Sequence, residues 1–269
     1  MKIVGRWLGQ PLLVFGGVCA IVAYLGSINY AWTAWQPATC LPDRCFCEAI
    51  RPAVFRQPSN TWSSLGFVLA GLVVMRLGFN EATPAATRSN LLMQHRGLIG
   101  LFSLALVLIG VGSAFYHASL SFYGQFVDVF GMYLIATFMV MYSLARMYGR
   151  VRLMIVLYLV VNLALIFLLL YVPTLRRYAF GFWLLLGLGL EYRYTRQTHV
   201  QINLKPLQHG LVYMALAFGI WLLDISKTVC FAASWLQGHA VWHILGAISA
   251  FHLYLYYRSE QSGMIIPPD

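Results

Sequence analysis

The chain has 269 residues, of which 60% are hydrophobic and only 10% are charged. A soluble domain carries about a quarter charged residues, so this composition indicates a protein whose solvent is lipid. The net charge of +10 could suggest nucleic-acid binding, but the 18 Lys and Arg stand in short clusters between apolar runs and leave no basic face. That pattern is typical of membrane topology signals and argues against a nucleic-acid partner.

Apolar stretches of about twenty residues, long enough to cross the hydrocarbon core of a bilayer, recur along the chain. The first follows Lys2 and Arg6 and could be a signal peptide, but its apolar run is longer than a typical signal core and no convincing small-residue cleavage site ends it. We therefore predict an all-α polytopic membrane protein with eight transmembrane helices. The expected spans are residues 12–32, 61–79, 97–117, 126–147, 153–172, 178–194, 210–228 and 239–257.

The distribution of Lys and Arg predicts how these spans are oriented, because cytoplasmic segments carry an excess of both. With the N-terminus inside, the inner segments hold twelve of the 18 basic residues and the outer segments hold six. Both termini of this integral, multi-pass protein are thus expected in the cytoplasm. The longest irregular stretch, residues 33–60, falls on the outer side.

Two pairs of polar residues stand at the ends of predicted spans, where an ionisable side chain can cost about 3 kcal/mol and requires a reason. Ser113 and His117 end the third span, and His239 and His243 begin the last. The members of each pair are four residues apart, so they share one helix face. Two imidazoles at this spacing can bind one metal ion. A third ligand from another helix would leave one tetrahedral position open, as in catalytic zinc sites.

The predicted topology brings these groups to one end of the molecule. The span that ends at His117 runs outward, and the span that begins at His239 runs inward. Asp128 follows His117 by eleven residues across a short turn expected at residues 121–125, so it should lie at the same depth. A lone His at a helix end is more often an interfacial residue than a ligand. The shared depth nevertheless favours a metal site formed by His117, His239 and His243.

The remaining histidines are expected elsewhere. His252 is nine residues beyond His243, which places it about 180° around the helix. The other three fall in or beside inner loops: His95, His199 and His209.

Four further polar residues in the spans are predicted to have structural roles. Asp224 and Lys227 are three residues apart and should pair with each other. Asn162 should form a hydrogen bond to another helix. Glu191 should lie at the inner interface beside Arg193.

Together these residues resemble the alkaline ceramidase family within the CREST superfamily of membrane hydrolases, which also includes the adiponectin and progestin receptors. The resemblance is carried by Ser-x-x-x-His, the Asp eleven residues later and the late His-x-x-x-His, with Cys47-Glu48 and Asn60-Thr61-Trp62-Ser63-Ser64. It covers the seven spans after Thr61 and the loop before them, and implies a seven-helix bundle to which the first helix is an addition. The chain is accordingly divided into an N-terminal helix with its outer loop (1–58), a ceramidase-like core (59–258) and a short cytoplasmic tail (259–269).

The resemblance implies an intramembrane zinc-dependent hydrolase that cleaves the amide bond of a lipid such as ceramide through a zinc-activated water. His117, His239 and His243 would bind Zn²⁺. Asp128 would orient or deprotonate the water, and Ser113 would support the site or stabilise the oxyanion. The scarce polar loops suit a lipid substrate that enters sideways from the membrane.

Functions of other classes remain open on the sequence. The relationship to adiponectin receptors makes a zinc-containing membrane receptor or scaffold an alternative, and an ester lipase could use the same scaffold. A transporter is less favoured, because no pair of helices broken by Gly or Pro marks inverted repeats. Five aromatic residues could shape an acyl pocket or simply pack: Trp62, Phe115, Tyr116, Tyr123 and Trp242.

The loop before the core departs from the eukaryotic ceramidases that it resembles, which carry a calcium site of acidic residues and an Asn around the Cys-Glu segment. Glu48 is retained, but Ile50 stands two residues after it, and Gln57 stands where an acidic residue would be expected. Calcium binding is therefore doubtful, and the pattern suggests a bacterial-type homologue. In a bacterium the protein would lie in the inner membrane, with its site open to the periplasmic leaflet.

Four of the five cysteines fall in segments predicted to be outside. Cys45 and Cys47 are too close for the common zinc-finger spacings, and a disulfide is favoured if their loop faces an oxidising compartment. The resemblance implies a disulfide in this loop, which we propose joins Cys47 to Cys230. Cys40–Cys45 remains open as a competing pairing.

Overall fold

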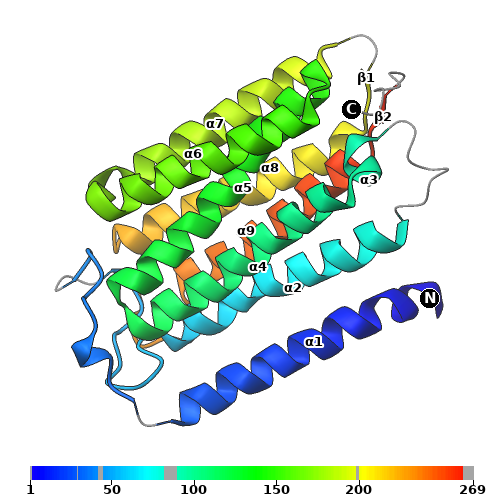
Figure 1. The fold of residues 1–269 in the computed structure, drawn as a ribbon. Coiled ribbons are helices and arrows are strands. Elements are labelled where there is room, and N and C mark those ends of the chain that lie inside the picture. Colours follow the sequence, from blue (N-terminus) through cyan, green and yellow to red (C-terminus); the bar gives the residue numbers. More distant parts are fainter. Residues whose placement is uncertain (1, 29, 42–44, 82–89, 198–199, 263–269) are drawn as a thin grey trace.

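The computed structural model describes residues 2–28, 30–41, 45–81, 90–197 and 200–262. Within them the chain forms a bundle of long helices that run side by side (Figure 1). The all-α polytopic fold predicted from the sequence is confirmed. The long helices are α1 (Lys2–Ser27), α2 (Pro58–Glu81), α4 (Arg96–Ser119), α5 (Phe122–Tyr148), α6 (Val151–Tyr171), α7 (Arg176–Thr195), α8 (Leu204–Ile225) and α9 (Gly238–Arg258).

Several short elements connect the long helices. They are the 3₁₀ helices η1 (Trp32–Ala34) and η3 (Pro173–Leu175), the single-turn helix α3 (Leu91–Gln94), and the strands β1 (Val200–Gln201) and β2 (Gln261–Ser262). The two strands pair antiparallel, so the segment after α9 is fastened to the segment before α8.

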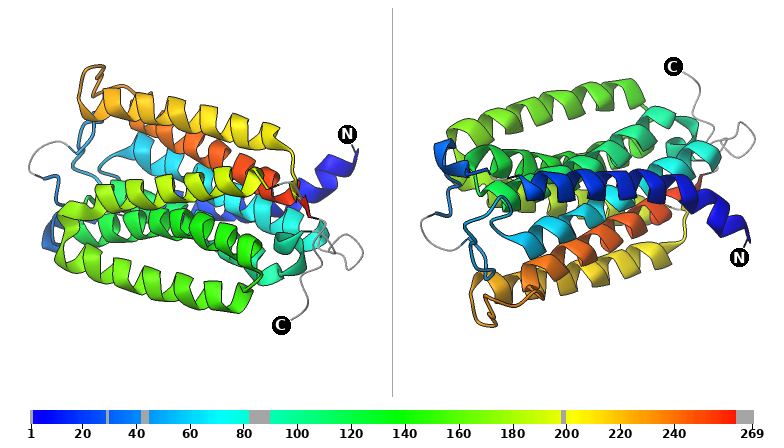
Figure 2. Two further views of the ribbon diagram at one scale, coloured as in Figure 1. Left: turned by 90° about the horizontal axis from the view of Figure 1, so that it is seen from above. Right: turned by 90° about the horizontal axis from the view of Figure 1, so that it is seen from below.

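Six helices in the described part of the chain are long and apolar enough to cross a membrane, by length and composition: α1 from Leu8 onward, α2, α4, α5, α6 and α8. Helices α7 and α9 have 20 and 21 residues and run alongside them (Figure 2). They are less apolar because α7 carries charged residues near both ends and α9 carries three histidines. The protein is a multi-pass membrane protein.

Each predicted span coincides with one long helix, but some ends differ. Helix α1 ends at Ser27, five residues before the predicted end of the first span. Helix α5 begins at Phe122, four residues earlier than its apolar run suggested, so the predicted turn at residues 121–125 is too long. The reason is a helix cap: the Ser121 hydroxyl accepts a hydrogen bond from the Gly124 N–H at 3.1 Å.

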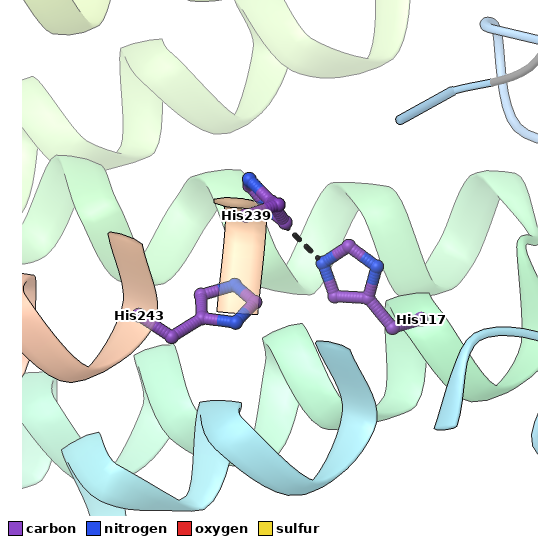
Figure 3. A group of neighbouring side chains, drawn as sticks. All are labelled: His117, His239 and His243. Atoms are coloured by element: carbon purple, nitrogen blue, oxygen red, sulfur yellow. Dashed lines mark hydrogen bonds between the residues drawn. The ribbon is translucent and has the colours of Figure 1, made fainter. Parts of the chain in front are cut away.

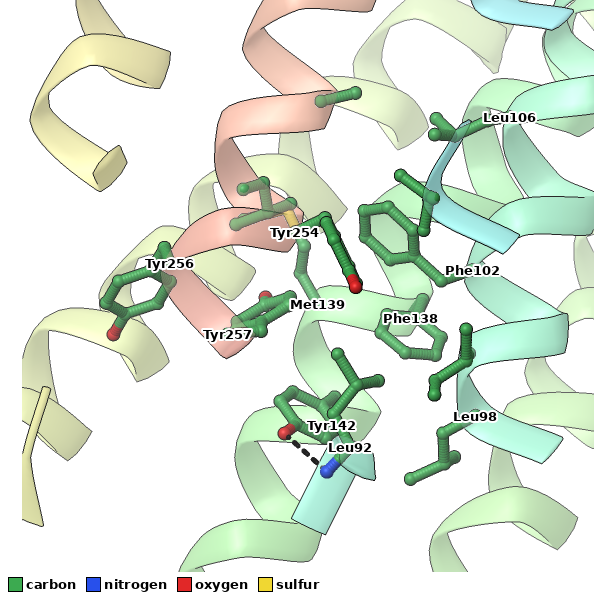
Figure 4. Close-up of a cluster of buried hydrophobic side chains, with 14 of the residues drawn as sticks. Leu92, Leu98, Phe102, Leu106, Phe138, Met139, Tyr142, Tyr254, Tyr256 and Tyr257 are labelled. Carbon is green, nitrogen blue, oxygen red and sulfur yellow. Dashed lines mark hydrogen bonds between the residues drawn. The ribbon is translucent and has the colours of Figure 1, made fainter. Parts of the chain in front are cut away.

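The central helices α2, α4, α5 and α9 hold the bundle together. Helix α4 packs on α2 and α5, and α9 packs on α2, while α6 and α7 cover α5 and α8 covers α9. Helix α1 lies outside the bundle against α2 (Figure 2). As predicted, Asn162 of α6 bonds a neighbouring helix: its Nδ2 donates to Thr137 Oγ1 of α5 at 2.9 Å. A large apolar cluster fills the inner half of the bundle (Figure 4), including Phe102, Phe138, Tyr254 and Tyr257.

A buried ion-pair cluster joins the C-terminal ends of α5, α7 and α9, which the sequence predicts to be their inner ends. Arg146 pairs with Glu191, and its Nη1 donates to Glu260 Oε2 at 3.2 Å. Three tyrosine rings lie within 5.0 Å of its guanidinium carbon: Tyr142, Tyr194 and Tyr257. The predicted position of Glu191 at the interface beside Arg193 is wrong, because the neighbouring helix supplies a counter-charge inside the bundle.

Candidate metal centre

Three histidines converge at one end of the bundle, which the sequence predicts to be the outer end. His117 lies in the last turn of α4, and His239 and His243 lie in the first turns of α9. Their possible ligand nitrogens all lie within 4.8 Å of one another, and all three side chains are buried (Figure 3). No other group of three His, Cys, Asp or Glu in the described part of the chain has this arrangement. The spacing of the sequence thus brings together the three residues predicted as ligands.

The hydrogen bonds around His117 fix which of its nitrogens is free. Gln57 Nε2 donates to the Glu48 carbonyl at 3.1 Å, so the Gln57 amide oxygen is the atom that lies 2.9 Å from His117 Nδ1. An amide oxygen can only accept, so in the neutral ring Nδ1 carries the proton and Nε2 has the lone pair. That Nε2 lies 3.2 Å from His239 Nε2. Two neutral imidazoles facing each other in this way, with a third beside them, form a donor set that fits Zn²⁺.

The position of His239 depends on α8 as well as on α9. The ring is stacked between Phe46 and Trp242, with centroid separations of 3.8 and 5.3 Å. The backbone N–H of His239 donates to Asp224 Oδ2 at 3.0 Å. The predicted pairing of Asp224 with Lys227 is therefore wrong. The carboxylate is buried and accepts the His239 N–H at the start of α9 and the Cys47 N–H of the loop before α2, while Lys227 is exposed.

Ser113 and Asp128, the two predicted catalytic residues, adjoin the histidines. Ser113 Oγ lies 3.1 Å from His243 Nε2, and the Ser113 side chain lies next to the Asp128 carboxylate of α5. On the other side of the His243 imidazole, Ser63 Oγ of α2 lies 2.9 Å from Nδ1 of that ring. Helices α4 and α5 approach this closely because residue 112 is Gly: a Cβ there would lie 2.9 Å from the Asp128 backbone nitrogen. Gly112 thus allows the Asp128 carboxylate of α5 to lie beside the histidines.

Comparison with known proteins identifies the family. The protein-family model for ceramidase matches residues 45–263. The chain belongs to the ceramidase family. It is also similar to a protein of Dictyostelium discoideum that is provisionally named alkaline ceramidase dcd3B, with 28% identity over an alignment of 226 residues that covers 72% of this chain and 76% of that protein. Membership of the ceramidase family indicates an amidohydrolase that acts on lipid. The match begins after α1, so that helix lies outside the part shared with the family.

The outer loop of this ceramidase-family chain uses its acidic residue as a helix cap. Glu48 accepts hydrogen bonds from the backbone N–H groups of Ser59 and Asn60 at 2.7 and 2.9 Å, at the start of α2. Burial raises the pKa of the Glu48 carboxyl, and these two hydrogen bonds oppose that rise. Both carboxylate oxygens are thus occupied, the Gln57 oxygen faces His117, and Ile50 offers no side-chain donor. The described part of this loop does not fit a calcium ion.

Two disulfides hold the loops at this end of the molecule. Cys40 pairs with Cys45, and Cys47 pairs with Cys230. The two pairings considered from the sequence are therefore compatible, and both are present. The second joins the loop before α2 to the loop between α8 and α9, so the segments that carry Glu48 and lead into His239 are covalently linked.

A cavity of about 360 Å³ opens beside the histidines, bounded by α5, α7, α8 and α9. Asp128 and His239 line it. A smaller apolar cavity of about 100 Å³ lies deeper between the same helices and shares Met132, Phe180 and Trp242 with the first. The candidate centre therefore adjoins a cavity that has a few polar side chains in a mostly apolar wall, and this cavity is extended by a deeper apolar one.

The five aromatic residues considered for an acyl pocket have different positions. Tyr116 and Trp242 line the cavity beside the histidines. Phe115 faces a separate apolar cavity of about 620 Å³ against α1. Trp62 and Tyr123 are 37% and 54% exposed. Two of the five thus adjoin the candidate site.

Sequence reasoning missed residues that contact the histidine rings, among them Gln57 and Ser63. Gln57 was named from the sequence only because an acidic residue would be expected at its position. Its contact with His117 joins residues 60 positions apart in the chain, which a single sequence does not indicate. Ser63 belongs to the quoted Asn60–Ser64 segment, but nothing in a single sequence relates that segment to α9. The available signal was the cluster of small polar residues in the first turns of an otherwise apolar span.

Proposed function

We propose that this ceramidase-family protein is an intramembrane zinc-dependent amidohydrolase that cleaves the amide bond of ceramide or a related lipid. The observation that supports this best is the group of three buried imidazoles whose ligand nitrogens lie within 4.8 Å of one another, beside a carboxylate in the cavity wall. Zinc, when bound there, would lower the pKa of a water molecule and polarise the amide carbonyl.

The chain's own residues would carry out the proton transfers. The Asp128 carboxylate would accept a proton from water as the water oxygen adds to the amide carbon. The same proton would then pass to the departing nitrogen as the C–N bond breaks, which gives a fatty acid and an amine. The Ser113 hydroxyl would donate a hydrogen bond to the carbonyl oxygen as negative charge develops on it.

The cavity geometry supports a substrate that comes from the bilayer. Helix α7 packs on α5 and α8 packs on α9, and these two outer helices lack extensive packing against each other. A lipid could enter between them with its amide near His239 and its acyl chain in the apolar extension beside Met132 and Phe180. The apolar walls would also keep bulk water from the reacting amide.

The location of the disulfides supports the predicted orientation. Cys40–Cys45 and Cys47–Cys230 lie at the same end as the histidines, and disulfides persist in oxidising compartments. We place this end on the non-cytoplasmic side and both termini in the cytoplasm. In a bacterial host the protein would lie in the inner membrane and the site would face the periplasmic leaflet.

The test is to measure zinc content and fatty-acid release on one purified sample, with a panel of ceramides and phospholipid esters. About one zinc per chain with release from ceramide would establish the amidase. Release from phospholipids alone would indicate an ester lipase on the same scaffold. Zinc without any turnover would favour a receptor or scaffold, and the absence of zinc would overturn the proposal.

A further inference from the structure

Two arginines begin α7 at the wall of the cavity that contains Asp128 and His239. Arg176 is half-buried, and its Nη1 donates to the Pro173 carbonyl at 2.9 Å, which fixes the guanidinium at the start of the helix. Arg177 extends towards α8, where its guanidinium carbon lies 5.7 Å from the centre of the Trp221 ring. Both arginines and Trp221 line the cavity.

The Arg177–Trp221 contact lies where α7 and α8 separate. Because the two helices lack extensive packing against each other, this contact bridges the proposed lateral entrance of the cavity. No acidic side chain stands in the first turn of α7, and none caps it. The positive end of the helix dipole therefore adds to the two guanidinium charges at this entrance.

Among the acidic residues that the structure describes, none forms an ion pair with Arg176 or Arg177. The side chains of Asp43, Glu81 and Asp269 lie outside the described part, and four others are engaged elsewhere: Glu48 and Asp224 with backbone N–H groups, and Glu191 and Glu260 with Arg146. Asp128 is the one acidic residue among those that line the cavity. Two guanidinium groups facing one carboxylate leave the cavity positive, even before any metal is counted. A cavity of this sign concentrates anions.

We propose that Arg176 and Arg177 select a lipid amide whose polar head carries an anionic group, a phosphate or a carboxylate, close to the scissile bond. This inference rests on the proposed function, because it assigns the substrate class of the same site. A guanidinium presents paired N–H donors that match the oxygens of such groups. Arg176 would hold the head beside the amide, and Arg177 would meet it at the entrance. The apolar extension of the cavity would take the chain.

The test compares three lipids with the same acyl chain: ceramide, ceramide 1-phosphate and an N-acyl amino acid. Each is presented in phosphatidylcholine vesicles to the wild-type protein, to Arg176→Gln, to Arg177→Gln and to the double variant. The wild type should favour the two anionic lipids in kcat/KM. Each single substitution should reduce that preference roughly 10-fold, mainly through KM, because one charge-assisted contact is lost. Arg177→Lys should restore part of it.

Arg51→Gln is the matched control. Arg51 also stacks on a tryptophan at this end of the molecule, 4.7 Å from the Trp235 ring centre, but it does not line the cavity. Its substitution should leave the preference for anionic lipids at the wild-type value. A preference for neutral ceramide in the wild type, or an equal preference in wild type and double variant, would overturn the inference.

Two further arms separate a lipid head group from other anions. Inorganic phosphate should compete with ceramide 1-phosphate only at far higher concentrations than the lipid itself. Equal potency would make the pair a site for a free anion and overturn the inference. In vesicles rich in phosphatidylglycerol, an acceleration of all three lipids that disappears in the double variant would make the arginines membrane anchors, with the same consequence.

A failure of the proposed function can be distinguished from a failure of this inference about the arginines. If the zinc-loaded wild type hydrolyses none of the three lipids, the amidase assignment fails. The affinities of the same samples for ceramide and ceramide 1-phosphate then decide the inference. Tighter binding of the phosphorylated lipid, lost in the double variant and retained in Arg51→Gln, would support the arginine pair. Equal affinities would remove it.

Discussion

The two ends of α5 and α9 each bury a polar cluster, but the clusters are built differently. At the inner end, Arg146 lies between Glu191 and Glu260, so each charge has an opposite charge in contact. At the outer end, His117 and His239 direct Nε2 atoms at each other across 3.2 Å, beside a cavity. Each buried charge of the inner cluster has its partner in the structure, whereas the histidine nitrogens of the outer cluster converge on one point beside a cavity, where a metal ion could bind them. The comparison separates a structural cluster from a candidate functional one at opposite ends of the same bundle.

Removal of a candidate ligand should produce the largest effect at the outer end. In His243→Ala the three-histidine donor set loses one member, so bound zinc should be lost and turnover should fall about 1,000-fold or more. Metal analysis and fatty-acid release on purified protein measure both. His252→Ala is the control, because His252 lies on the same helix but stacks on Tyr213 away from the site. Zinc at the wild-type level in His243→Ala would disprove the ligand assignment.

Replacement of the carboxylate should separate chemistry from metal binding. Asp128→Asn keeps the shape of the side chain and its contact with Ser113, so zinc content should stay near the wild-type value. The proton acceptor is lost, and kcat should fall about 100- to 10,000-fold. The ratio of kcat to zinc content in each sample is the measurement. Full turnover by Asp128→Asn would remove the proposed general base.

The inner cluster should respond through stability rather than through metal content. In Arg146→Met the carboxylates of Glu191 and Glu260 remain buried without their cation, which costs about 3–5 kcal/mol of unfolding free energy. Thermal denaturation in detergent should show a much lower midpoint, while folded protein at low temperature still contains zinc. Arg193→Met, at an exposed position of α7, should change little. Zinc loss in folded Arg146→Met would contradict the separation of the two ends.

Local patterns were predictable from the sequence, and contacts between distant segments were not. The i, i+4 pairs and the eleven-residue interval to Asp128 depend on helix geometry alone, so the convergence of the histidines could be predicted. Asp224 was expected to use its neighbour Lys227, but its partners are backbone N–H groups 15 and 177 positions away. Glu191 likewise uses Arg146, 45 positions away. A single sequence contains no signal for which helices pack together, and that packing decides how each buried charge is compensated.

The smallest predicted effect concerns Gln57, which connects the outer loop to the candidate centre. Its Nε2 is held by the Glu48 carbonyl and its oxygen by His117 Nδ1, so the residue orients the ring and sets its tautomer. Gln57→Leu removes both contacts at similar volume, and zinc affinity should fall about 10- to 100-fold. Competition with a chelator of known affinity measures this without reference to turnover.

Gln57→Glu distinguishes ring orientation from loop packing. A carboxylate still accepts the proton of His117 Nδ1, but it can no longer donate to the Glu48 carbonyl. If ring orientation is what Gln57 contributes, zinc affinity should recover in Gln57→Glu even though the loop loses a hydrogen bond, and the visible spectrum of the cobalt-substituted protein should match the wild type. If instead both variants bind zinc equally weakly and both lose thermal stability, Gln57 acts only by holding the loop. The buried contacts of Gln57 at the outer end would then be purely structural, like those of the Arg146 cluster at the inner end.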